Sequence, residues 1–178
     1  MRSRNLKRLV VNASVARAAG GEGATASLSI NCTEFLEAFR DESPHHIVMT
    51  FELSEEWDKH QSNFAAEWLG NMIATRRFHY IELPQNRALY DEIEATVVRE
   101  EDIDAMLKDF HLFGAALETD QTVISLDETI RGLFKRASQQ VSGIRNIIWV
   151  NPDRTAEEDP IVWLQNGAPT EPNRRLSA

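Results

Sequence analysis

Four polar positions stand where predicted structural elements meet, and together they could bind a divalent cation. Asn12 follows the apolar run RLVV, and Asp127 ends the run QTVISLD. Glu56 lies in the first turns of a helix predicted after HHIVMT, and Asp109 directly precedes an apolar residue. Oxygen ligands suit Mg²⁺ or Mn²⁺, and such an ion can activate water for phosphodiester cleavage. We therefore take these four residues as the candidate catalytic and metal-ligating set.

Apolar runs alternating with amphipathic segments predict the elements that must position this set. They indicate an α/β fold with a central, mostly parallel sheet flanked by helices on both faces. We expect strands over 8–11, 45–50, 77–83, 121–127 and 145–152. We expect helices over 31–40, 52–76, 86–99, 101–118 and 128–141, and a loop over the Ala-, Gly- and Ser-rich residues 13–28. Residues at the carboxyl ends of neighbouring parallel strands converge on one crevice, where the four polar side chains would meet.

The chain is expected to form one main domain with a short tail. Residues 1–152 carry the alternating pattern of the domain, and residues 153–178 are a polar, Pro-containing C-terminal extension, partly docked or flexible. Within the extension, residues 159–169 can dock as a helical turn with Pro160 near its start.

Composition limits the partners and the compartment. The formal net charge of −9 argues against broad electrostatic adhesion to nucleic acid or to an anionic membrane, although carboxylates clustered around a metal also make a chain acidic. No apolar run approaches the ~18 residues that span a bilayer, and the basic N-terminal run Arg2–Arg8 lacks the apolar core of a signal peptide. Cys32 is the single cysteine, which excludes an internal disulfide. These features favour a cytoplasmic protein with no membrane partner.

Three blocks of the sequence resemble the signature blocks of PIN-domain nucleases. They are RLVVNASVARAAG, HIVMTFELSEEW and KDFHLFGAALETDQTVISLDETIRGLF, and their order and spacing match over about residues 7–150. The family pattern has a strand ending in Asp-x-Ser/Thr, a helical Glu, an Asp that opens a helix, and Ser/Thr-x-Asp after a strand. In this chain it falls on Asn12-Ala13-Ser14, Glu56, Asp109 and Ser125-Leu126-Asp127. Glu56 is preferred to its neighbours Glu52 and Glu55 because its distance from VMT fits better.

The resemblance implies a PIN-like three-layer fold and a metal-dependent endoribonuclease that uses one or two Mg²⁺ or Mn²⁺ ions. It implies single-stranded or structured RNA as substrate, with DNA as the alternative. Such enzymes are often toxins of toxin–antitoxin pairs or defence nucleases, so an antitoxin protein or a second copy of the chain is an expected partner. Ser14 and Ser125 would hold the acids by hydrogen bonds, with Glu128 beside them, and Arg131 would meet a substrate phosphate.

Asn12 departs from this pattern, which expects aspartate. An amide oxygen can coordinate a metal or accept a hydrogen bond, but it brings no charge. Two explanations compete: natural divergence toward a weak or inactive nuclease, or an inactivating substitution that allows a toxic enzyme to be produced. The second is our working hypothesis because the other three acids are present.

Other functions and sites remain as alternatives. The chain could be a non-catalytic PIN-like module that binds RNA or protein, or a receiver-like signalling domain, although the last predicted strand lacks the lysine expected of a receiver. Glu56 and His60 are spaced for a zinc pair on one helix, but a surface pair explains them better. His111 could face the pocket, although a packed core or rim histidine is the favoured interpretation.

Overall fold

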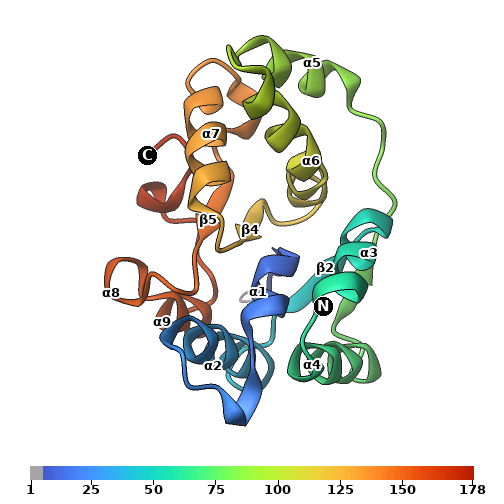
Figure 1. The fold of residues 1–178 in the computed structure, drawn as a ribbon, viewed down its shortest axis with the longest axis vertical. Coiled ribbons are helices and arrows are strands. Elements are labelled where there is room, and N and C mark those ends of the chain that lie inside the picture. Colours follow the sequence, from blue (N-terminus) through green and yellow to red (C-terminus); the bar gives the residue numbers. More distant parts are fainter. Residues whose placement is uncertain (1–5) are drawn as a thin grey trace.

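The computed structural model describes residues 6–178 of the chain, which fold around a central parallel sheet (Figure 1). Within those residues the sheet has five strands in the order β3-β2-β1-β4-β5, and every neighbouring pair is parallel. The strands are β1 Arg8–Val11, β2 His46–Met49, β3 Phe78–Tyr80, β4 Thr122–Ile124 and β5 Ile148–Val150. The predicted α/β class is confirmed. The order differs from the 2-1-3-4-5 order of receiver-like folds, so the receiver alternative is wrong.

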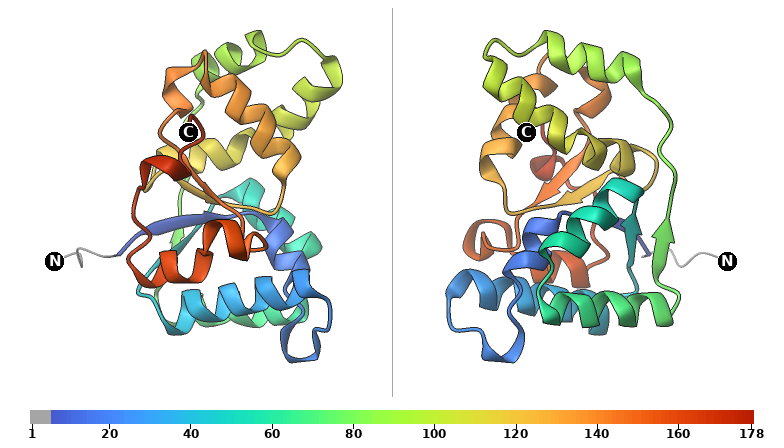
Figure 2. Two further views of the ribbon diagram at one scale, coloured as in Figure 1. Left: turned by 90° about the vertical axis from the view of Figure 1, so that its left-hand side faces the viewer. Right: turned by 45° about the vertical axis from the view of Figure 1, so that its right-hand side comes forward.

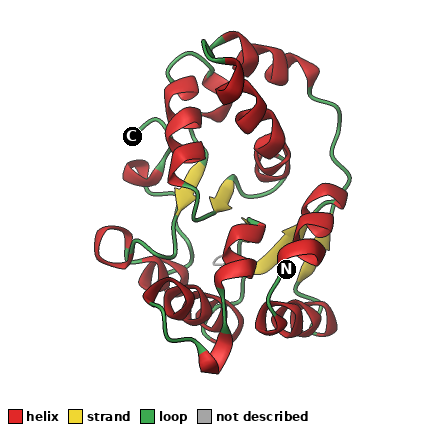
Figure 3. Ribbon diagram, viewed as in Figure 1, coloured by secondary structure: helices red, strands yellow, loops and turns green. Residues whose placement is uncertain are grey.

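Helices cover both faces of this sheet, giving three layers (Figure 2; Figure 3). One helical layer contains α1 Ala13–Ala18, α2 Ser27–Asp41, α4 Asn63–Ala74 and α9 Pro160–Gln165. The other contains α5 Arg87–Ala95, α6 Glu100–Leu117 and α7 Glu128–Ser138. Helix α3, Phe51–His60, packs against α1 and also touches α6. The remaining short elements are η1 Gly21–Gly23, η2 Ser142–Ile144, α8 Thr155–Glu158 and η3 Pro172–Arg174. This arrangement is consistent with a PIN-like three-layer fold.

The connections reverse direction between β1 and β4, which are hydrogen-bonded neighbours. The chain leaves β1 into α1 on one face of the sheet and leaves β4 into α7 on the other face (Figure 2). Such a switch point opens a crevice at the carboxyl ends of the two strands, where ligands of open α/β sheets bind. The fold therefore places Asn12 and Asp127 on either side of one crevice.

The sheet and the tryptophans form the core. The central residues of β1, β2, β4 and β5 are buried, as parallel strands covered on both faces require, whereas the edge strand β3 is partly exposed. Trp57 and Trp68 are buried too, as predicted, and their rings stack with centroids 6.0 Å apart. Each indole N–H also finds a carbonyl acceptor, Trp57 on Val11 and Trp68 on Leu36. These bonds satisfy polar atoms that would otherwise be unpaired in the core.

The loop predicted over residues 13–28 is wrong, because most of it is helical. Helix α1 begins directly after Asn12, whose side chain caps it, and its residues ASVARA include the strongest helix former, alanine. The 3₁₀ turn η1 and the start of α2 at Ser27 occupy the remainder. The composition that suggested flexibility instead supplies small residues that pack closely: Ala13, Val15 and Ala16 are buried.

Two helix predictions also need correction. The helix expected over 52–76 is two helices, because Ser62 starts a new one and accepts a hydrogen bond from the backbone N–H of Ala65. Asp109 does not open a helix, since α6 runs unbroken from Glu100 to Leu117 and places it in the interior. The acidic first turn of α6 favours its true start, because carboxylates there complement the helix dipole.

Much of the C-terminal segment 153–178 lies on the domain. Helix α9 begins at Pro160 and packs against α2, burying Trp163 and Leu164. Arg175 then bridges to Ile148 of β5. At the other end of the chain, the part of the basic run Arg2–Arg8 that precedes residue 6 lies outside the described residues. In residues 6–178, none of the helices is both long enough and apolar enough to cross a bilayer.

Candidate metal centre

One pocket of about 460 Å³ brings the four predicted residues together at the carboxyl ends of β1 and β4. It is lined by Asn12, Glu56, Asp109 and Asp127, which come from four different elements, and by Ser14. Neither Glu52 nor Glu55 lines it; both face a neighbouring pocket of about 690 Å³ that shares Glu56 as a wall. The choice of Glu56 from the sequence therefore agrees with the geometry.

Asn12 joins β1 to α1 and acts as the helix cap. Its backbone N–H donates to the carbonyl of Ile124 at 2.8 Å, which extends the β1–β4 ladder by one residue. Its side-chain Oδ1 accepts from the N–H of Ser14 at 2.9 Å. Asparagine and aspartate cap helices about equally well, so the fold accepts either residue here. Asn12 is buried, with 8% of the residue exposed, and its amide contributes an oxygen without charge.

Glu56 is placed by its neighbour in sequence, Trp57. The indole N–H of Trp57 donates to the carbonyl of Val11 at 2.9 Å, which ties α3 to the end of β1. Thr50 caps α3 by accepting from the N–H of Leu53, so the helix begins directly after β2. These two anchors hold Glu56 on the side of α3 that faces the crevice.

Asp109 carries the electrostatic signature of the site. Burial and, next, the charge of Glu56 raise the pKa of Asp109 from its usual 3.8 to about 6. His111 opposes this shift, Asp127 adds a smaller increase, and Lys108 opposes it least. The charged form of Asp109 is therefore disfavoured by burial first and by Glu56 second, and a bound cation would compensate both effects. The pocket is thus arranged to gain from binding a positive ion.

Asp127 and the two serines form a rigid turn, although not as predicted. One oxygen of Asp127 accepts from the N–H of Ile130 at 2.9 Å and caps α7. Ser125 Oγ accepts from the backbone N–H of Asp127, and Ser14 Oγ accepts from that of Leu126. The prediction that the serines hold the carboxylates is therefore wrong: they fix the backbone between β4 and α7, because their hydroxyls face amide N–H groups.

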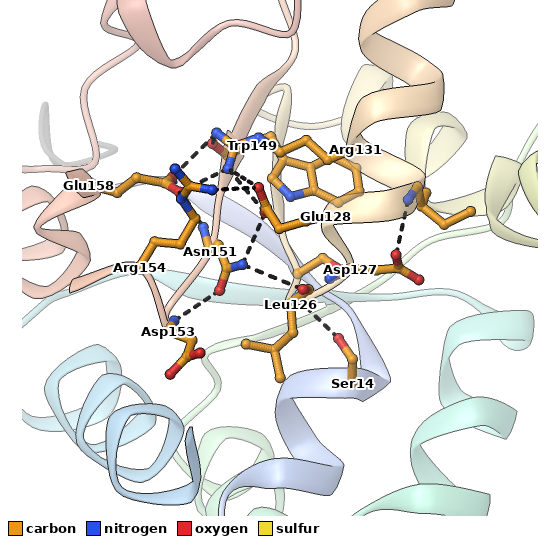
Figure 4. A network of polar contacts seen from close by, with 12 residues as sticks. Ser14, Leu126, Asp127, Glu128, Arg131, Trp149, Asn151, Asp153, Arg154 and Glu158 are labelled. Atoms are coloured by element: carbon orange, nitrogen blue, oxygen red, sulfur yellow. Dashed lines mark hydrogen bonds and ion pairs between the residues drawn. The ribbon is translucent and has the colours of Figure 1, made fainter. Parts of the chain in front are cut away.

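The predicted roles of Glu128 and Arg131 need correction (Figure 4). Both belong to an ion-pair network beside β5, in which Arg131 bonds Glu158 at 2.8 Å and the carbonyl of Trp149 at 3.1 Å. Glu128 contacts Arg131, Arg154 and the amide of Asn151. Burial disfavours the charge on Arg131, but the contacts with these carboxylates outweigh it and raise its pKa. The guanidinium is engaged by protein carboxylates and does not line the pocket, so it is not free for a substrate phosphate.

The network predicts that Arg131→Met lowers stability without touching the pocket. Removing the cation leaves Glu158, whose side chain is 10% exposed, with less compensation. We expect a loss of about 2 kcal/mol in the free energy of unfolding, since Arg154 still contacts Glu158. Urea denaturation measures the loss, and Mn²⁺ affinity should stay unchanged. Lys135→Met, on an exposed position of the same helix, should cost below about 0.5 kcal/mol. Equal stability of the two variants would contradict the structural role of Arg131.

Sequence reasoning missed the cations that do line the pocket. They are Arg17 of α1, Lys59 of α3 and Lys108 of α6, all exposed. The one available signal was their proximity in sequence to the predicted ligands: Lys59 lies three residues after Glu56, and Lys108 precedes Asp109. Among the described residues none of the three forms a salt bridge, unlike Arg131. They are the positive groups that an anionic ligand would meet at the rim.

Two histidines accompany the acids. His111 is not a packed core residue: its Nε2 lies 3.2 Å from Oε1 of Glu56, and its side chain is 11% exposed. Glu56, Asp109 and His111 each offer a ligand atom, and these atoms lie within 4.8 Å of one another. His60 is exposed on the rim, as expected of a surface residue.

The donor set fits a divalent cation. Three carboxylates and an amide oxygen line one pocket, where burial and the charge of Glu56 raise the pKa of Asp109. Such donors suit Mg²⁺ or Mn²⁺. No protein-family model and no curated protein matches the chain, so the site is characterised by this geometry alone.

Proposed function

We propose that the chain is a PIN-type, metal-dependent endoribonuclease whose activity is limited by Asn12. The observation that carries the proposal is the meeting of Asn12, Glu56, Asp109 and Asp127 in one pocket at the switch point of the sheet. The four residues come from segments far apart in the sequence, so their meeting does not follow from being neighbours on one helix.

Glu56, Asp109 and Asp127 would hold one or two Mg²⁺ or Mn²⁺ ions, with Asn12 at the fourth position. A bound ion of this kind polarises a phosphodiester and activates water for in-line attack. The chain's own residues fix the geometry, since Asn12 and Asp127 are locked as helix caps and Trp57 fixes α3. Pre-arranged oxygens avoid reorganisation when the substrate arrives.

Arg17, Lys59 and Lys108 replace Arg131 as the residues that meet the substrate backbone. An acidic enzyme needs local cations beside its carboxylates to approach a polyanion, and these three line the same pocket. Their side chains are exposed and long, and they contact phosphates without reading base sequence.

Lys59→Ala and Lys108→Ala should therefore weaken RNA binding and reduce its salt dependence. Each lysine that neutralises one phosphate of a single strand contributes about 0.7 to the slope of log affinity against log salt. Fluorescence anisotropy with a labelled single-stranded RNA, at several KCl concentrations and with EDTA present, gives the slopes. Lys135→Ala, on the exposed face of α7 and outside the pocket, is the matched control. Slopes that fall equally in all three variants would show general electrostatic attraction instead of contacts at the pocket.

The biological role that best suits such a nuclease is that of a toxin restrained by an antitoxin protein, or of a defence nuclease, in the cytoplasm. The experiment that tests the enzymatic proposal incubates the Asn12→Asp variant with single-stranded RNA, structured RNA and DNA in Mn²⁺. We expect cleavage of RNA that EDTA abolishes. Cleavage that persists in EDTA, or none at saturating Mn²⁺, would contradict the proposal.

A non-catalytic PIN-like module that binds RNA or protein is the second candidate. It is favoured by one observation: Oδ1 of Asn12 is engaged by the N–H of Ser14, so the residue serves the fold without any metal. Such a module would gain no thermal stability from Mn²⁺, whereas the nuclease would.

A further inference from the structure

The imidazole of His111 lies where a metal ligand would lie, although the sequence pattern of acids does not include it. Its Nε2 is 3.2 Å from Oε1 of Glu56, and Glu56, Asp109 and His111 each offer one ligand atom that lies within 4.8 Å of the other two. Two ligand atoms bound to one ion at about 2.1 Å stand roughly 3.0–3.4 Å apart in octahedral or tetrahedral geometry. The Glu56–His111 contact already has the spacing of one edge of a coordination polyhedron.

The surroundings of His111 point to a function beyond packing. The side chain is 11% exposed, and its Nδ1 is buried with no hydrogen-bond partner among the residues described. An unpaired buried nitrogen costs about 1–3 kcal/mol, so packing alone does not account for a histidine at this position. Glu56 forms the wall between the two neighbouring pockets, with Asp109 lining one and His111 lining the other.

The opposite side of the site is less available to an ion. Asn12 brings no charge, and one oxygen each of Asn12 and Asp127 is engaged by a backbone N–H of the helix that it caps. The best-placed donors with few other bonds are therefore the side chains on α3 and α6. An imidazole among them changes the chemistry, because nitrogen ligands favour first-row transition metals over Mg²⁺.

We propose that His111 is a metal ligand that, with Glu56 and Asp109, makes a mixed nitrogen–oxygen site selective for Mn²⁺ over Mg²⁺. The inference rests on the proposed function to the extent that the ion is the one used for hydrolysis. It adds a nitrogen ligand on the α3–α6 side to the oxygen ligands of the proposed site, which include Asp127 and Asn12.

Pulsed electron paramagnetic resonance of Mn²⁺ bound to the full chain tests this directly. We expect a ¹⁴N coupling from one directly bound imidazole. His111→Gln keeps an N–H donor near Glu56 but removes the ring, so the coupling should vanish. Mn²⁺ affinity should fall by at least the about 10–100-fold that loss of an outer-shell partner costs, because a direct ligand is lost. Mg²⁺ affinity, measured by competition, should change little. His60→Gln is the matched control, since His60 lies on the rim of the pocket that Asp109 lines, and it should keep the coupling.

The outcomes separate this inference from the proposed function. Saturable Mn²⁺ binding without ¹⁴N coupling, or an unchanged affinity in His111→Gln, would overturn the role of His111 and leave an oxygen-only metal site. Absence of saturable Mn²⁺ binding in both the unsubstituted chain and Asn12→Asp would overturn both. Because the resonance is recorded on the unsubstituted chain first, the test does not depend on the folding of the variant.

Discussion

Asn12→Asp should raise Mn²⁺-dependent cleavage of single-stranded RNA by about a thousandfold at Mn²⁺ concentrations below saturation. The substitution keeps the helix cap, because aspartate can accept from Ser14 as asparagine does. It adds one negative charge at the pocket wall. A charge ~4 Å from a cation contributes roughly 4 kcal/mol at an effective dielectric near 20, which is about a thousandfold in occupancy. Initial rates across a Mn²⁺ titration provide the measurement.

The control for this prediction adds the same charge elsewhere. Asn71→Asp lies at an exposed position of α4, outside the pocket, and should leave the rates unchanged. The metal-free Asn12→Asp variant should also be less stable than the unsubstituted chain, because it adds a fourth carboxylate to three that already repel. Equal activity of Asn12→Asp and the unsubstituted chain at every Mn²⁺ concentration would remove the assigned role of this position.

Asp109→Asn should abolish metal binding while making the metal-free fold more stable near neutral pH. The folded-state pKa of Asp109 is about 6 and its usual value is 3.8, so the folded protein holds this proton more tightly than the unfolded chain. Stability therefore falls as pH rises from 3.8 through about 6, and above that window the charged carboxylate destabilises the fold. Asparagine removes this effect. We expect a gain of about 1–2 kcal/mol at pH 7.5, after allowance for solvent screening of a half-buried group.

Urea denaturation at pH 5 and pH 7.5, with EDTA present, measures this effect. The unsubstituted chain should lose stability between the two pH values by more than Asp109→Asn does. Asp104→Asn, at an exposed position on the same helix, is the matched control and should follow the unsubstituted chain. A less stable Asp109→Asn at pH 7.5, with an unchanged pH profile, would mean that Asp109 has a structural role and that neither burial nor the charge of Glu56 disfavours its carboxylate.

The strands were predictable because their side chains carry a strong, local signal. Parallel strands buried on both faces read as short apolar runs, and the ends of those runs located Asn12 and Asp127. Helix α1 was not predicted because alanine-rich residues without a wide apolar stripe resemble a linker. Alanine nevertheless favours a helix, and Asn12 caps α1. The break between α3 and α4 was not predicted because the apolar stripe continues from one helix into the next. Only Ser62, which caps α4, marks the break.

The residues of the candidate site also differ in how well the sequence predicted them. Spacing alone gave a weak signal for Glu56 and Asp109, and it was their positions in the blocks that resemble the PIN pattern that selected them; both line the pocket. The sequence did not predict the positions of Glu128 and Arg131. Asp127 is the N-cap of α7, and the first turn of that helix carries both residues toward β5 and Glu158. The contact of His111 with Glu56 depends on the packing of α6 against α3, which no local pattern reports.

The central claim is that Glu56, Asp109 and Asp127 together hold a divalent cation. Isothermal titration of Mn²⁺ into Asn12→Asp, and into the double variant Asn12→Asp/Asp109→Asn, tests it most directly. We predict saturable binding in the single variant and none in the double variant at pH 7.5. Equal Mn²⁺ affinity in the two proteins, or no saturable binding in the single variant, would contradict the claim.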